Sequence, residues 1–184
     1  MKHLYLSFTF LVVFKTTFAQ TTQSDSYLAW SSTRKLTASD FIIKTSNLQT
    51  SPSFAQFYMD FQVGGFDFMA KNFNKKVHNY LIKSASWLDT TYNTDSSIKY
   101  QQTLFDIAEI YTRRFRKELK ENKKKILSGT SFIKEINAKI MTDFPQRRIE
   151  YDTDTKFGAD PAKQKQWEGQ IQMELLELKN FTNE

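Results

Sequence analysis

The side chains that most often bind transition metals or act as nucleophile and base are scarce in this chain. Its 184 residues include no cysteine and two histidines, His3 and His78. This composition excludes disulfide scaffolds, CxxC redox sites, iron–sulfur clusters and zinc sites built from several histidine or cysteine ligands. There is also no GxSxG nucleophile motif, P-loop or glycine-rich dinucleotide loop. We interpret His78, which falls in an expected strand, as an ordinary surface or half-buried residue.

Two carboxylates, Asp106 and Glu109, lie one turn apart in a segment with helical periodicity. As a pair they could perform acid–base chemistry. Acids at this spacing are common in helices, however, and Glu109 precedes Arg113 by four residues, the spacing of an intrahelical ion pair. We therefore expect structural roles for both.

The remaining candidate is a basic run over residues 113–125, which holds eight cations and two acids. Its cations are Arg113, Arg114, Arg116, Lys117, Lys120, Lys123, Lys124 and Lys125. Such a run could bind an acidic polymer or a lipid head-group surface, or it could be a solvated helix end, which we favour. Phe115 is its only aromatic residue, so the run lacks the interleaved rings expected for single-stranded nucleic acid.

The N-terminus resembles a cleavable export signal over residues 1–19. Lys2 is followed by a nearly continuous apolar stretch over residues 4–14, and Thr17 and Ala19 supply small residues before a cleavage site. The stretch is shorter than the roughly 20 residues that span a bilayer. We expect a protein that is exported to the periplasm or the outside of the cell. We expect no lipid anchor, because no cysteine follows the signal, and no transmembrane segment after cleavage. Without Lys2 and Lys15 the formal charge falls from +6 to +4, so the chain outside the basic run carries about −2.

After residues 20–28, which we expect to be a flexible segment, the pattern of apolar and polar residues first predicts strands. Apolar residues alternate with polar ones from residue 56 to 63, Gly64-Gly65 fits a tight turn, and alternation resumes over 66–70. A third run over 77–87 follows another turn. Three strands joined by short turns predict an antiparallel β-meander with one buried face.

Helices follow the strands. Leu104, Ala108, Tyr111, Phe115 and Leu119 recur every three or four residues, which predicts a long helix over about 96–126. A second helix is expected from Thr130 or Ser131 until Pro145 ends it, and a third from Asp160-Pro161 onward. Residues 29–184 should therefore form a single α+β domain.

Short motifs along residues 30–178 carry a family resemblance. They comprise Trp30-Ser31, Arg34 to Thr37, Asp40-Phe41, Ser86-Trp87, Gln102, Phe105 to Tyr111, Arg113, Tyr151-Asp152, Thr155, Gly158, Gln164 and Trp167. In their order and spacing the chain resembles the secreted zinc-peptidase-like family known as domain of unknown function 922, in its Bacteroidetes-like form. The resemblance implies a zincin-like arrangement of the α+β domain and a zinc cofactor.

The family's His-Glu-x-x-His motif is degenerate in this chain. In that motif two histidines on one helix face bind zinc, and the glutamate takes a proton from the metal-bound water. Here Tyr100 and Leu104 stand at the two ligand positions and Gln101 at the base, while Phe157 corresponds to a later family histidine. The resemblance thus implies that all four positions have lost their chemistry, and we expect the former site to have become part of the core.

Three functions follow as hypotheses. The first is a catalytically inactive relative of a zinc peptidase, with no metal or cofactor, that binds an envelope protein or has a structural role there. The second is an active metal-dependent hydrolase whose ligands have moved, for instance to His78 with Asp106 or Glu109. The third is a binder of an anionic envelope polymer or surface through residues 113–125, which is compatible with the first. Export makes nucleic acid an unsuitable partner.

Overall fold

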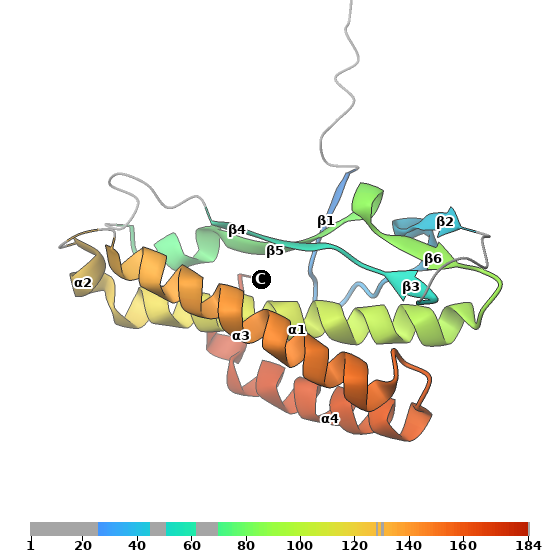
Figure 1. Cartoon of the computed structure of the whole chain (residues 1–184). Helices are drawn as coiled ribbons and strands as arrows, with labels where there is room; N and C mark the ends of the chain where they lie inside the picture. The colour runs from blue at the N-terminus through green and yellow to red at the C-terminus, as the bar shows by residue number, and fades with distance from the viewer. Residues whose placement is uncertain (1–25, 45–50, 62–69, 128, 130, 184) are drawn as a thin grey trace, which may run out of the picture.

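In the computed structural model, which describes residues 26–44, 51–61, 70–127, 129 and 131–183, the strands lie on one side of a long central helix and two further helices on the other. Figure 1 shows the strand layer above the helix α1, with α3 and α4 packed along and beneath it. The strands precede the helices in the chain, so the expected α+β class is confirmed.

The first sheet consists of β1 (Tyr27–Ala29), β4 (Phe57–Phe61) and β5 (Val77–Ile82), in the order β1-β5-β4 with antiparallel pairing. Burial alternates along β5, whose Val77, Asn79 and Leu81 point to the core. The period-2 pattern of β4 is confirmed as well, because Phe57, Met59 and Phe61 pack against that core. Since β1 includes Tyr27 and Leu28, the end of the segment expected to be flexible is a strand.

A second sheet contains β2 (Ile42–Lys44), β6 (Trp87–Asp89) and β3 (Ser53–Phe54), with β6 in the middle. The prediction of a single strand over 77–87 is therefore wrong, because β5 ends at Ile82 and the chain turns before β6 begins. Ser86 stabilises this turn, since its hydroxyl donates to the Ile82 carbonyl at 2.7 Å. The expected turn at 64–65 and the strand at 66–70 lie outside the described residues, except for Ala70, which is at a bend.

The long helix predicted over 96–126 is α1 (Thr94–Glu121), followed by the short α2 (Lys123–Leu127). Asn93 caps α1 by accepting a hydrogen bond from the Ser96 amide. All five residues of the predicted apolar stripe are buried. Because α1 lies between the strands and the other helices, its polar residues are also buried at Gln101 and from Thr103 to Arg113.

The expectation that Pro145 ends the second helix is wrong, because α3 runs from Ser131 to Thr155 through it. Proline removes one amide donor, whose acceptor would be the carbonyl of Met141. Met141 is exposed, so water can bond to that carbonyl, while Ile133, Ile136 and Ile140 before the proline and Tyr151 after it hold both halves against the core.

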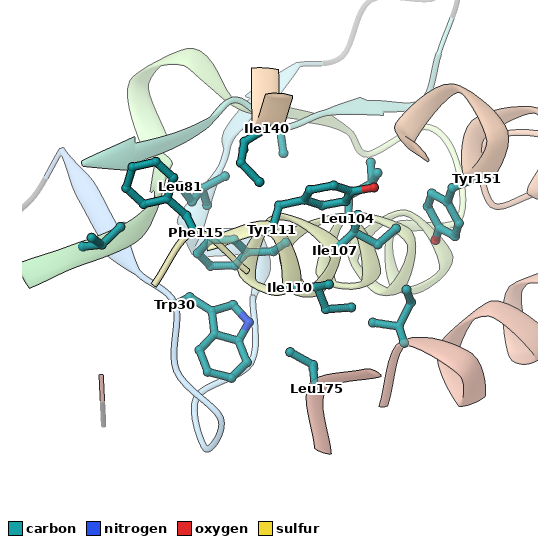
Figure 2. Close-up of a cluster of buried hydrophobic side chains, with 14 of the residues drawn as sticks. Trp30, Leu81, Leu104, Ile107, Ile110, Tyr111, Phe115, Ile140, Tyr151 and Leu175 are labelled. Carbon is teal, nitrogen blue, oxygen red and sulfur yellow. The ribbon is translucent and has the colours of Figure 1, made fainter. Parts of the chain in front are cut away.

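The predicted start of the last helix is confirmed. In α4 (Pro161–Glu177), Asp160 accepts hydrogen bonds from the amides of Ala162 and Lys163, and proline occupies the first turn. Trp167, Ile171 and Leu175 face the core, which Figure 2 shows around α1 with side chains from every layer. Among the described residues, no helix is both long enough and apolar enough to cross a membrane.

Candidate functional site

Tyr100, at the first position of the degenerate motif, is a buried structural residue. Its ring stacks on Tyr151 of α3 with centroids 5.1 Å apart, and its hydroxyl donates to the carboxylate of Asp152. Burial, followed by the nearby Asp152 carboxylate, raises the pKa of Tyr100 above the ordinary phenol value. The residue is therefore a neutral phenol, whereas metal binding would require a phenolate.

Gln101 and Leu104 are also integrated into the core. The Gln101 amide nitrogen donates to the Ser53 hydroxyl of β3 at 2.9 Å, and Leu104 is fully buried. An amide cannot accept a proton near neutral pH, so Gln101 cannot replace a general base. A phenol, an amide and an isobutyl group do not form a zinc-binding set, so the residues at these positions do not fit the metal.

Phe157 lies next to Tyr100 but is not part of the core. The two rings meet edge to face at 6.5 Å, in the turn between α3 and α4. Phe157 is 48% exposed and has a positive φ of 56°. The expectation that all four degenerate positions became core is therefore wrong at Phe157, because the left-handed turn directs its side chain to the surface.

The two carboxylates one turn apart have separate environments. Glu109 is buried and accepts hydrogen bonds from Arg113 at 3.0 Å and from Arg116 at 2.7 Å. The predicted ion pair with Arg113 is confirmed, while Arg116 shares the same oxygen. With two guanidinium groups bonded to one of its oxygens, Glu109 is part of a buried ion-pair cluster and has a structural role.

Asp106 lies instead at the edge of a pocket of about 670 Å³ between α1, α4 and the loop at residues 35–38. Its Oδ1 accepts from the indole of Trp30 at 2.8 Å and from Gln102 at 2.9 Å, and its Oδ2 from Gln172 at 3.3 Å. Burial raises the pKa of Asp106 above its ordinary value. A pocket of this volume whose lining includes a titratable group with a perturbed pKa is the usual form of a small-ligand site.

This pocket is a candidate site that the sequence did not predict. The sequence showed Asp106, but its partners Trp30 and Gln172 lie 76 and 66 residues away. The only available signal was that Trp30, Gln102 and Asp106 all fall within the motifs of the resemblance.

The basic run is divided by the fold. Arg113 and Arg116 are buried with Glu109, so the expectation that they belong to a binding surface is wrong. The helix is covered on two sides here, because Arg113 donates to the Leu175 carbonyl of α4 and Arg116 donates to the Val77 carbonyl of β5. Arg114 is exposed and pairs with Glu174. The exposed or partly exposed remainder is Lys117, Lys120, Lys123, Lys124 and Lys125.

His78 is half-buried on β5, as expected. Its Nδ1 lies 2.7 Å from the amide nitrogen of Asn183, and burial together with the charge of Arg116 lowers its pKa. The described residues contain no group of three or more histidine, cysteine, aspartate or glutamate side chains placed to hold a metal ion. A ligand set relocated to His78 therefore has no support in this part of the chain.

Comparisons with known proteins returned no relatives. No protein-family model, curated protein or solved structure matches this chain.

Proposed function

We propose that this protein is an exported, catalytically inactive relative of secreted zinc peptidases that serves as a binding module in the cell envelope. The main support for this proposal is the hydrogen bond from Tyr100 to Asp152. Tyr100 stands at a position where the family has a zinc ligand, but here its side chain connects α1 to α3. Gln101 and Leu104 support the same conclusion, since neither side chain can bind zinc or activate water. Binding of a partner by the protein surface requires neither zinc nor an activated water.

The direct test is metal analysis of the purified protein together with a peptide-hydrolysis assay. We expect far less than one zinc per chain and no hydrolysis that a chelator suppresses. Stoichiometric zinc removed by EDTA, together with chelator-sensitive proteolysis, would contradict the proposal. If any hydrolysis appears, the double variant His78→Ala, Asp106→Asn determines whether relocated ligands cause it.

Export is tested in cells that express the full chain. The apolar stretch at 4–14 and the small residues at 17 and 19 support cleavage after Ala19. N-terminal sequencing of the envelope or medium fraction should therefore start at Gln20. A chain retained in the cytoplasm with Met1 at its N-terminus would exclude this location.

A second candidate function is binding to an anionic envelope surface through the five lysines of α1 and α2. Three of their ammonium groups lie over aromatic rings, which orients them: Lys120 over Phe181 at 5.5 Å, Lys123 over Phe73 at 5.7 Å and Lys125 over Phe132 at 4.8 Å. Lysines held in this way form a stable positive surface.

The test compares two triple variants in co-sedimentation with vesicles that contain anionic phospholipid. Lys120→Gln, Lys124→Gln and Lys125→Gln together should weaken binding and its dependence on salt. The matched control changes Lys156, Lys163 and Lys165, at the opposite end of α3 and α4, to glutamine. Equal retention of both variants at every salt concentration would remove this candidate.

A further inference from the structure

The pocket beside Asp106 is lined by charged residues and by an apolar wall. The wall includes Leu36 and Ile171, which are buried, and Ile98, which is partly buried. These three residues come from the loop, from α4 and from α1, so the cavity is formed only when the three elements pack together. Its volume of about 670 Å³ accommodates a small organic ligand.

Asp106 is a buried acid without a cationic partner. It is 3% exposed, accepts hydrogen bonds from three neutral donors, and forms no ion pair with any described residue. Among the described residues one donor bonds to Oδ2, the amide of Gln172 at the long distance of 3.3 Å, so this oxygen can accept another donor. A buried carboxylate in this state is stabilised by a cationic group that enters the pocket.

Lys35 supplies the opposite charge in the lining of the same pocket. Lys35 is exposed and forms no ion pair with a described residue. Burial raises the pKa of Asp106, and the positive charge of Lys35 has a smaller effect that lowers it. The two groups therefore line the same pocket, and the described residues include no ion pair between them. A ligand with one positive and one negative group can bridge them.

The remaining charged residues favour a ligand with both charges. Lys99 also lines the pocket, as do the carboxylates Asp95 and Glu168, so both signs are represented in nearly equal number. A purely anionic ligand would meet three acids, and a polycation would meet two lysines. A zwitterion with an apolar body matches the lining better than either.

We propose that this pocket binds a zwitterionic α-amino acid with an apolar side chain. The ligand's ammonium donates to Asp106, its carboxylate pairs with Lys35, and its side chain packs against Leu36, Ile98 and Ile171. This site would be the ligand site of the binding module, so the assignment rests on the function proposed above.

Calorimetric titration of the purified protein with three ligands tests each contact. L-Leucine carries both charges, N-acetyl-L-leucine lacks the ammonium and L-leucinamide lacks the carboxylate. We expect L-leucine to saturate one site, and each of the other two to bind on the order of tenfold or more weakly, because each loses a charge-assisted hydrogen bond.

Two variants assign the contacts. Lys35→Gln, at an exposed position, should lower the affinity for L-leucine to that for L-leucinamide and leave L-leucinamide binding unchanged. Asp106→Asn should weaken both ligands that carry an ammonium and leave N-acetyl-L-leucine unchanged. Asp60→Asn, on the first sheet, is the matched control and should alter none of the three affinities.

Absence of saturable L-leucine binding to the folded protein would overturn the assignment, as would equal affinities for the three ligands. An unchanged L-leucine affinity in Lys35→Gln would do the same. A metal-free, inactive protein that does not bind L-leucine contradicts this assignment alone, whereas a zinc-loaded, proteolytic protein contradicts the binding module itself.

Discussion

Tyr100 shows how one side chain can occupy a position that a metal ligand holds elsewhere. Its hydroxyl is buried and donates to Asp152, a carboxylate that also forms an ion pair with Arg148 at 3.7 Å. Tyr100→Phe removes the donor and leaves Asp152 without that partner. We expect a loss of about 1–3 kcal/mol in the free energy of unfolding, measured by denaturant titration.

The control for this change is Tyr92→Phe. Tyr92 is 53% exposed, so its hydroxyl is hydrated in both states and the substitution should have little effect. Equal stability of the two variants would show that the bond between Tyr100 and Asp152 does not hold α1 to α3.

Asp106 should make the stability of the protein depend on pH. Because burial raises its pKa in the folded state above the ordinary 3.8, the folded state binds this proton more tightly than the unfolded state. The free energy of unfolding should then fall as pH rises from the ordinary value through the raised one. Asp106→Asn removes this loss because an amide does not ionise. The amide oxygen can still accept the hydrogen bond from Trp30.

Denaturant titrations from about pH 4 to pH 7 should therefore show the stability of Asp106→Asn rising relative to that of the wild type. Asp60→Asn serves as the control for a general charge effect. If the difference in the free energy of unfolding between Asp106→Asn and the wild type stays constant over this range, Asp106 titrates alike in the folded and unfolded states.

The turn between α3 and α4 depends on one glycine. Gly158 has a φ of 82°, and a Cβ at this position would lie 2.8 Å from the Cβ of Tyr100. Gly158→Ala should therefore destabilise the protein by about 1–3 kcal/mol, because it adds both backbone strain and overlap.

Gly169 provides the matched change within α4. A Cβ there meets no atom within 4 Å, so Gly169→Ala should stabilise the helix by about 0.5–1 kcal/mol. Denaturant titration of both variants tests the pair. A neutral Gly158→Ala would mean that the turn can move away from Tyr100.

The helices were more predictable than the strands because their signals are local. The apolar stripe of α1 and the Asp160-Pro161 start of α4 are visible within one segment. Pro145 misled the prediction because its cost depends on whether water reaches Met141 and on packing at both ends of α3, and neither is encoded at the proline.

The short strands depend on distant partners. β2 has three residues and pairs in parallel with β6, which follows more than 40 residues later. Alternation over two or three residues cannot be distinguished from a loop. In the same way, the distribution of charge in residues 113–125 was visible, but the burial of Arg113 and Arg116 was not, because it requires Glu109 and the layers on either side of α1.

Across the whole molecule, stability should be greatest in α1 and lowest in the second sheet. The strands cover one side of α1, while α3 and α4 cover the other side, and the residues of α1 from 103 to 113 are all buried. β2, in contrast, is at a sheet edge, and Ile42 and Ile43 are each 48% exposed. Elements with few buried contacts open locally, whereas a central helix is exposed only by global unfolding.

Native-state hydrogen exchange measures this difference. The amide of Ile107 in α1 should exchange with the free energy of global unfolding and respond to denaturant as strongly as unfolding does. The Ile42 amide, bonded to the Ser86 carbonyl at 2.9 Å, should exchange faster and with little response to low denaturant. Equal protection of the two amides would show that the second sheet unfolds only with the core, so that both sheets and the helices form a single cooperative unit.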